Sequence, residues 1–362
     1  MAVIQYKCPN CGGPLQFDPE SGKYTCEYCR GVFTQEELDE QTAKEEAKAA
    51  QSGEVKPEAN QNEAAKGDDA KAGDAVVYTC PSCGATIVTD STTAATFCYY
   101  CHNPVVLSGR LEGDYKPDYI VPFKIDKKKA LEIFDEWIKK KKYVPAAFYS
   151  KSQIEKLSGV YFPYLLYTCN IDGSIDATAT KAEISQRGGI EYTDTGTYHV
   201  RRSGNMEVKH VLRNALQKAN KKLAEAVLPF DMEGLKPFNM SYLSGFFAEK
   251  KDIEKESMEK EMREEVQNYA VAKLKESVSA YDDVTITANN TKLVNEKWEY
   301  ALFPVWTLTY NDNGKVYYFS VNGQSGKTIG ELPIDNKKLI LTFLLIFVPF
   351  ALILLALFYF VL

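Results

Sequence analysis

The stretch "YKCPNCGG" at Tyr6–Gly13 returns as "YTCPSCGA" at Tyr78–Ala85, 72 positions further along the chain. A second Cys-x2-Cys pair follows each copy at the same distance, which gives two units of the form Cys-x2-Cys-x14-Cys-x2-Cys. Two tight turns joined by a hairpin can present four sulfur atoms to one tetrahedral metal ion. We therefore predict one metal site in residues 1–33 and another in residues 76–107. The predicted ligands are Cys8, Cys11, Cys26, Cys29, Cys80, Cys83, Cys98 and Cys101.

Zinc is the metal that this ligand set favours. Four thiolates with no open position are typical of structural zinc, whereas catalytic zinc keeps a position for water. The alternatives are an iron centre or redox Cys-x-x-Cys pairs, and redox pairs usually accompany a βαβ pattern that is not visible here. Zinc also supplies folding free energy that a unit of about 30 residues cannot obtain from its core. We predict two structural Zn²⁺ ions and expect His102, next to Cys101, to be a bystander.

The two units resemble the zinc ribbons of TFIIB-type proteins over residues 6–33 and 78–106. This resemblance implies a fold but no particular partner, because ribbons bind DNA, RNA and protein. Residues 76–107 contain no Lys or Arg, whereas phosphate contacts supply most of the affinity for nucleic acid. Protein partners are therefore favoured and nucleic acid is disfavoured. Near the Cys-x2-Cys turns, tyrosines fit either partner contacts or internal packing; they are Tyr28, Tyr99 and Tyr100.

The C-terminal stretch Leu339–Leu362, "LILTFLLIFVPFALILLALFYFVL", has 24 residues and no charge. As a helix it would extend roughly 36 Å, enough to cross a hydrocarbon core of about 30 Å. A buried hairpin of a globular core is the alternative. Lys337 and Lys338 precede the stretch, which favours a cytoplasmic N-terminal part. No signal peptide is visible at the N-terminus, so we expect reduced cysteines. We predict a single-pass cell-membrane protein embedded in the lipid bilayer, with its N-terminal domains in the cytoplasm.

Between the cysteine units, residues 34–75 are acidic and poor in large apolar side chains, which predicts a disordered linker with a frayed helix at its start. Residues 108–338 predict an α+β cytoplasmic domain with an antiparallel sheet. Helices are expected at Asp126–Lys142, with Asp126 as N-cap, and at about Ala248–Ser279, packed on its own domain rather than on a partner helix. The fold class is therefore multidomain: two small zinc ribbons with four cysteines each, a disordered acidic linker, an α+β domain and one transmembrane helix at 339–362.

No catalytic pattern is visible, so we predict that the chain is not an enzyme. The loop "NGQSGKT" at Asn322–Thr328 has two residues between its glycines where a phosphate-binding loop has four, and we interpret it as a β-turn. Cys169 is expected to be a buried apolar residue rather than a nucleophile. The lysine runs at 127–129 and 139–142 form either a solvated face or a surface for anionic lipid.

The whole arrangement resembles the YdjG-type zinc-ribbon membrane proteins of Gram-positive bacteria. That resemblance implies a role in an envelope-stress module, in which the chain helps to place a PspA-like membrane-remodelling protein, with an SPFH-domain partner, at the membrane. We therefore expect a membrane-anchored adaptor that recruits protein partners. The alternative is a membrane-tethered nucleic-acid-binding factor, helicase-like or related to transcription. The net charge of −6 disfavours this alternative.

Overall fold

The computed structural model describes residues 3–4, 6–41, 75–80, 86–98, 104–107, 110–111, 113–217, 227–312 and 315–361. The chain divides into two compact units. The first consists of Met1–Pro163, Leu216–Lys250 and Leu302–Leu362, and the second of Tyr164–Ala215 and Lys251–Ala301. The long strands β10 (Ser158–Arg187) and β14 (Asp283–Asp312) contribute residues to both units.

The body of the first unit is a sheet with the strand order β1-β8-β7-β13-β10-β14-β15-β16. Its short strands are β1 (Val3–Ile4), β7 (Thr93–Phe97), β8 (Pro104–Leu107), β9 (Tyr119–Ile120), β12 (Lys236–Pro237), β13 (Phe247–Glu249), β15 (Lys315–Asn322) and β16 (Thr328–Gly330). The pairing of β10 with β13 is parallel, which differs from the antiparallel sheet predicted from the sequence. The same short strand pairs antiparallel with β7 on its other side, so β13 joins the two parts of the sheet with one pairing of each kind.

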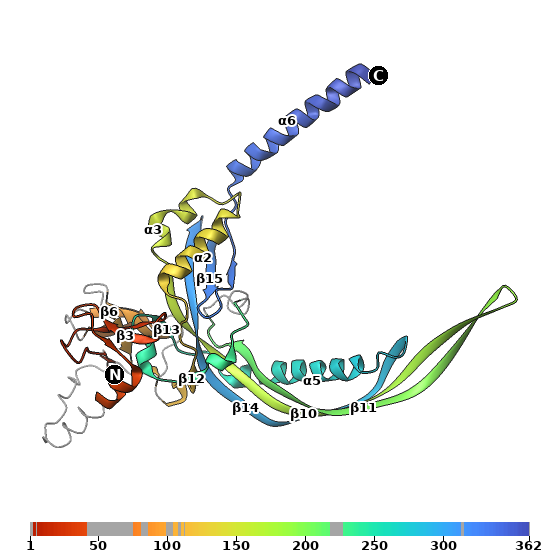
Figure 1. Cartoon of the computed structure of the whole chain (residues 1–362), viewed down its shortest axis with the longest axis horizontal. Coiled ribbons are helices and arrows are strands. Elements are labelled where there is room, and N and C mark those ends of the chain that lie inside the picture. The colour runs from red at the N-terminus through yellow and green to blue at the C-terminus, as the bar shows by residue number, and fades with distance from the viewer. Residues whose placement is uncertain are drawn as a thin grey trace. The chain divides into compact units, whose positions relative to one another are not determined.

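Helix α2 (Lys127–Lys139) covers the β15 side of this body (Figure 1). The predicted N-cap is confirmed, since Asp126 Oδ1 accepts a hydrogen bond of 2.7 Å from the Lys129 amide. Phe134 on the buried face of α2 meets Phe319 edge-on, with ring centroids 4.8 Å apart. Short helical turns complete the unit: η2 (Gly113–Tyr115), η3 (Ala146–Tyr149), α3 (Lys151–Ile154), η4 (Met232–Gly234) and η5 (Met240–Leu243).

The first cysteine unit, residues 6–41, has the three-stranded sheet β2 (Leu15–Asp18), β3 (Lys23–Cys26) and β4 (Val32–Phe33). Residues 35–41 form a helical turn after Thr34, whose hydroxyl accepts from the Glu37 amide while the Glu37 carboxylate accepts from the Thr34 amide. The helix predicted at the start of the linker is therefore present over these residues. The rest of the predicted linker, 42–74, lies outside the described residues.

This cysteine unit packs against η5 of the same compact unit. The hydroxyl of Tyr24, which is fully buried, lies 2.7 Å from Ser241 Oγ. The Phe17 amide donates to the Ser244 carbonyl at 3.1 Å, and the ring of Phe17 meets the ring of Tyr242 at 5.3 Å. The first cysteine unit is thus packed on the body through contacts with residues 241–244.

The second cysteine unit contains β5 (Ala75–Thr79), β6 (Thr86–Asp90), β7 and β8. The pairs Tyr24↔Phe33 and Thr25↔Val32 of β3 and β4 correspond, 72 positions on, to Thr96↔Val105 and Phe97↔Pro104 of β7 and β8. The sequence repeat therefore continues as a repeat in strand register. In addition, β7 pairs with β13, so this hairpin belongs to the sheet of the body. The domain limits predicted from the sequence remain predictions.

Helix α6 (Asn336–Val361) starts three residues before the uncharged stretch and continues through Pro349. Its span Asn336–Tyr359 is long and apolar enough to cross a membrane, and none of its most apolar window is buried inside the structure. A core helix of a soluble protein would be covered, so the predicted alternative of a buried hairpin is not what the structure has. Among the residues that the structure describes, α6 is the one helix long and apolar enough to cross a membrane, in line with the predicted C-terminal span.

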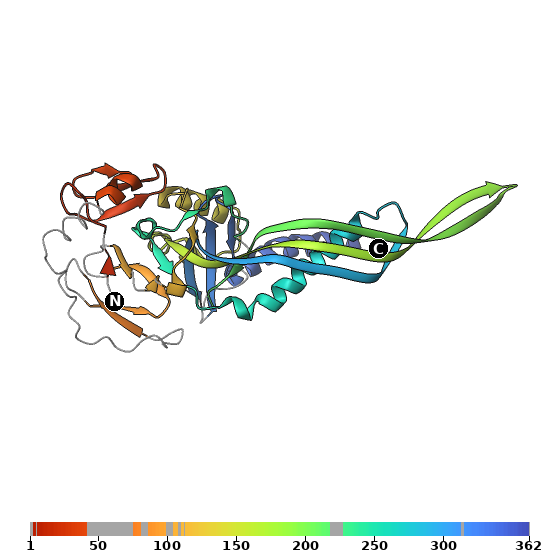
Figure 2. The same cartoon turned by 90° about the horizontal axis from the view of Figure 1, so that it is seen from below.

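The second compact unit is a sheet of three long strands, β11 (Ile190–Asn214), β10 and β14, with helix α5 (Glu259–Glu276) and η6 (Lys255–Ser257). Figure 2 shows the three strands side by side, with β11 in green, β10 in yellow-green and β14 in blue. Strands β10 and β11 pair from Tyr164↔Asn214 to Arg187↔Ile190. They turn at Gly188 and Gly189, with φ of 60° and 81°, which is the left-handed conformation that a tight two-residue hairpin turn requires.

Helix α5 packs on its own unit, as predicted. Its residues Met262, Val266 and Ala270 form one buried cluster with Tyr167, Cys169 and Ile171. The predicted limits, Ala248–Ser279, were too wide at the N-terminal end, where β13 and η6 stand instead. Within the predicted helix, Ala248 and Glu249 belong to β13 and pair with β7, and α5 itself begins only at Glu259.

Candidate metal centre

The structure brings the first four predicted ligands together. The Sγ atoms of Cys8, Cys11, Cys26 and Cys29 all lie within 4.8 Å of one another. The Cys8–Cys29 and Cys11–Cys26 pairs are each 3.5 Å apart. A tetrahedral ion with metal–sulfur distances of about 2.3 Å separates its sulfur ligands by roughly 3.8 Å. This group has the donor set and the spacing to bind one metal ion.

Two matching backbone turns hold these sulfurs. In the first turn the Cys8 amide donates to the Gly13 carbonyl and the Gly12 amide donates to the Cys8 carbonyl, at 2.6 and 2.8 Å. In the second, the Cys26 amide donates to Gly31 at 3.0 Å and the Arg30 amide donates to Cys26 at 2.9 Å. The fifth position of each turn has a positive φ, 71° at Gly12 and 57° at Arg30. Glycine adopts this left-handed conformation without strain, whereas the side chain of Arg30 makes it unfavourable.

The surroundings of the four thiols shift the pKa of Cys26 and the pKa of Cys29 in opposite directions. Burial works against the thiolate of Cys26, but the amide groups of Cys29 and Tyr28 donate to its sulfur and lower its pKa to about 7. At Cys29 the Gly31 amide favours the thiolate, and the neighbouring sulfurs of Cys8 and Cys11 outweigh it, so that its pKa rises to about 12. Several negative charges in so small a space need a cation to neutralise them. The cluster is therefore suited to a divalent ion that displaces the protons.

The second predicted ligand set is described in part. Cys80 and Cys98 are fully buried in one cluster with Tyr78, Val105 and Leu107. The remaining ligands, Cys83 and Cys101, lie outside the described residues, as do His102, Tyr99 and Tyr100. A second metal site thus remains a prediction, supported by the shared strand register and by the common location of Cys80 and Cys98.

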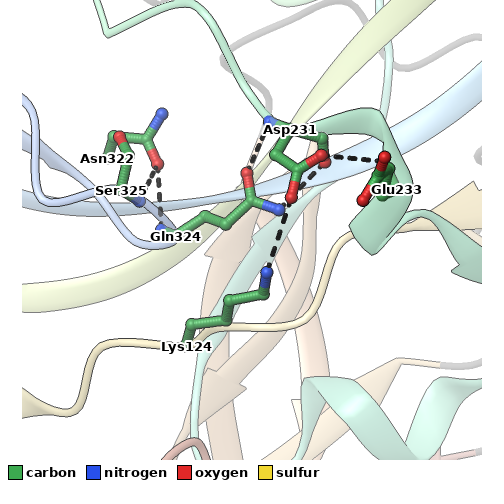
Figure 3. A network of polar contacts seen from close by, with 6 residues as sticks. All are labelled: Lys124, Asp231, Glu233, Asn322, Gln324 and Ser325. Atoms are coloured by element: carbon green, nitrogen blue, oxygen red, sulfur yellow. Dashed lines mark hydrogen bonds and ion pairs between the residues drawn. The ribbon is translucent and has the colours of Figure 1, made fainter.

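The loop Asn322–Thr328 is a turn between β15 and β16, paired from Phe319↔Gly330 to Val321↔Thr328. Asn322 is fully buried; its Nδ2 donates to the carbonyls of Val227 and Pro229 at 2.9 and 3.1 Å, and its Oδ1 accepts from the next amides in the turn (Figure 3). Gln324 exchanges two hydrogen bonds with the backbone of Asp231, at 2.7 and 2.9 Å. The polar side chains of this loop are therefore used to fix the segment 227–231, and the predicted β-turn is confirmed.

Cys169 lies on β10, and the histidines His199 and His210 lie on the neighbouring strand β11. Cys169 is buried beside Tyr167 and Trp298, and burial raises the pKa of its thiol. The side chain of His199 is largely exposed, 3.9 Å from Asp176. His210, with φ of 53°, lies where the pairing of β10 and β11 shifts register. The register shift at this position could not be predicted from the sequence, because an irregular strand position has no periodic pattern.

The chain is similar along nearly its whole length to a protein of Bacillus subtilis (strain 168) that bears the description "Uncharacterized protein YdjG". The two are 28% identical over 336 residues, which cover 93% of this chain and 92% of that protein. No protein-family model matches the chain, and no solved structure matches it. The comparison and the structure together support a YdjG-like protein with an N-terminal cysteine cluster, a sheet-rich α+β body and a C-terminal apolar helix.

Proposed function

We propose that this chain is a membrane-anchored adaptor whose cysteine units are zinc ribbons that hold protein partners at the cytoplasmic face of the membrane. The observation that supports this best is the exposed surface around the first cysteine cluster. Cys11 and Cys29 are exposed, and beside them Tyr28 and Val32 are 72% and 52% exposed. Zinc in this cluster would be structural, because four sulfurs leave no position for a substrate.

The surface formed by Tyr28 and Val32 has the character of a protein contact. The Tyr28 ring is held against Gly13, where a Cβ atom would lie 2.7 Å from Cδ2 of the ring. A tyrosine held in place on a rigid turn loses little entropy on binding, and tyrosine is enriched at interfaces. The opposite side of the unit is already covered, since Leu15, Phe17 and Tyr24 are buried against the body. The cluster side, with Tyr28 and Val32 exposed, is open to a partner.

Partners of the PspA-like or SPFH-domain class are the proposal that follows from the resemblance to YdjG-type proteins. Two ribbons on one anchored chain would give two weak contacts a high effective concentration. A binding role of this kind needs no catalytic step, and we propose that the chain is not an enzyme.

Capture from detergent-solubilised membranes, followed by mass spectrometry, tests the proposal. We expect Tyr28→Ser plus Val32→Ser to lose the partners that the wild-type chain retains. A matched pair in the second compact unit, Tyr269→Ser plus Val294→Ser, removes residues that are 52% and 44% exposed and should keep them. Equal loss in both variants, or unchanged partners after Cys80→Ser plus Cys83→Ser, would count against docking by the ribbons. Salt-sensitive binding of DNA or RNA by the full chain would favour the nucleic-acid alternative.

A further inference from the structure

One of the two lysine runs of α2 lies at the base of the membrane helix. The amide of Asp335, just before α6, donates to the Tyr143 carbonyl at 2.8 Å. Lys338 Nζ, in the first turn of α6, donates to the Val144 carbonyl at 2.7 Å. Both partners directly follow the run Lys139–Lys142. Figure 1 draws α2 beside the start of α6. The C-terminal end of α2 is thus fixed to the first turn of the helix that would enter the bilayer.

The contact lies close enough to the start of the uncharged stretch for its lysines to reach lipid headgroups. Asp335 is four residues before Leu339, the first residue of the uncharged stretch, and four residues of helix rise about 6 Å. This distance is shorter than the screening length of about 8 Å in physiological salt. Around the contact lie Ile334, which is 62% exposed, and Tyr149, which is 40% exposed and lies under Lys338 at 5.9 Å. Aromatic side chains of this kind are enriched where a chain meets the membrane surface.

The charge balance of this base is positive. Its lysines are Lys139, Lys140, Lys141, Lys142, Lys337 and Lys338, and its carboxylates are Asp135, Glu136 and Asp335. Asp135 pairs with Lys139 at 2.5 Å, and Asp335 lies 3.9 Å from Lys338.

Three of the lysines remain without such a partner. Lys140, Lys142 and Lys337 are exposed and make no ion pair with any residue that the structure describes. Lys141 lies over the Trp137 ring at 5.2 Å, a contact that leaves its charge uncompensated.

We propose that this surface, Lys139–Lys142 with Lys337 and Lys338, binds the anionic phospholipid headgroups of the membrane that α6 crosses. It rests on the proposed membrane anchor but not on the proposed partners. Clusters of four or more lysines next to a membrane helix attract anionic lipid by about a factor of five for each cation near the surface. The run Lys127–Lys129 at the opposite end of α2 takes no part: Lys127 donates to the Glu155 carbonyl and Lys129 pairs with Glu132.

The two runs give a matched test with equal charge removed from one helix. The full chain is reconstituted in phosphatidylcholine bilayers that contain a spin-labelled phosphatidylglycerol or phosphatidylcholine probe, and the relative association of the two probes is measured. We expect the wild type to prefer the anionic probe and this preference to fall at least about fivefold in K140Q/K141Q/K142Q. It should stay within about twofold in K127Q/K128Q/K129Q, and it should vanish near 1 M salt, where screening shortens to about 3 Å.

A charge-preserving variant separates lipid attraction from a folding defect. K140R/K141R/K142R should keep the wild-type preference, because it retains the cations at the same positions. Equal loss in the two glutamine variants, loss in the arginine variant, or no anionic preference in the wild type would overturn the inference. Failure of the wild-type chain to enter bilayers would overturn the anchor and this inference together. Loss of partner capture with an intact lipid preference would overturn the adaptor alone.

Discussion

Replacing Tyr24 by phenylalanine tests how the first cysteine unit is held on the body. The hydroxyl is fully buried and lies 2.7 Å from Ser241 Oγ, on a residue 217 positions away. Its loss breaks this contact and the hydrogen bond that the hydroxyl donates to Gln35 Oε1, and it leaves Ser241 with Gln35 as its remaining side-chain partner at 2.5 Å. Removing one member of a buried hydrogen-bonded set costs about 1–3 kcal/mol, and the surviving bond to Gln35 favours the lower part, about 1–2 kcal/mol.

Metal release from the full chain in mild detergent measures this effect. Tyr24 and the ligand Cys26 both lie on β3 (Lys23–Cys26), so loss of the contact loosens the strand that holds one ligand of the predicted ion and favours its release to a chelating dye. A loss of about 1–2 kcal/mol raises the population of the open form, and hence the release rate, by roughly 5- to 30-fold. Tyr28→Phe is the matched control, because Tyr28 is 72% exposed and its change should leave the rate within about twofold.

A double-mutant cycle identifies the contact itself. Ser241→Ala should raise the release rate in a similar way, and Tyr24→Phe combined with Ser241→Ala should cost less than the sum of the two single changes, because both remove the same bond. Additive effects, or a Tyr24→Phe rate equal to that of Tyr28→Phe, would refute the reasoning that this bond holds the unit in place.

Three further predictions concern stability, each measured by urea unfolding of the full chain in detergent. Arg30→Gly should stabilise the first cysteine unit by up to about 1 kcal/mol, because it relieves a positive φ of 57°; destabilisation would contradict this. Hydrogen bonds from Arg263 lower the pKa of Glu296, so their stabilisation should be complete above the unfolded pKa of about 4.3 and lost as the pH falls through the folded pKa. Glu296→Gln should remove that acid dependence, and an unchanged pH profile would refute it. Met262→Ala should cost about 2–5 kcal/mol by opening a cavity, whereas exposed Tyr269→Ala should cost well under 1 kcal/mol; similar losses would argue against α5 packing on its own unit.

The cysteine cluster was predictable because its ligands are local. Two Cys-x2-Cys turns and a short hairpin fix the sulfurs within 33 residues, and the spacing alone carries that geometry. The apolar helix at the C-terminus was predictable for the same reason, since composition over one segment is enough.

The docking of the first unit and the long hairpin were not predictable. Tyr24 and Ser241 pair across 217 positions, and a hydrogen bond between distant segments leaves no periodic signal. Towards the tip of β10 and β11, apolar residues such as Ile184 and Ile190 are 67% and 59% exposed, so the alternation that marks a half-buried strand fades there. The contact of Tyr143 with Asp335, which gives the two lysine runs different surroundings, depends likewise on the fold.

Zinc content per chain tests the central claim most directly. The full chain, purified in detergent under reducing conditions, should contain zinc at two ions per polypeptide, in line with its two four-cysteine patterns. Cys8→Ser plus Cys11→Ser should lower the content to one ion, since it breaks the cluster in which all sulfurs lie within 4.8 Å. A wild-type chain that binds less than one zinc ion, or a double variant with unchanged zinc, would contradict the account.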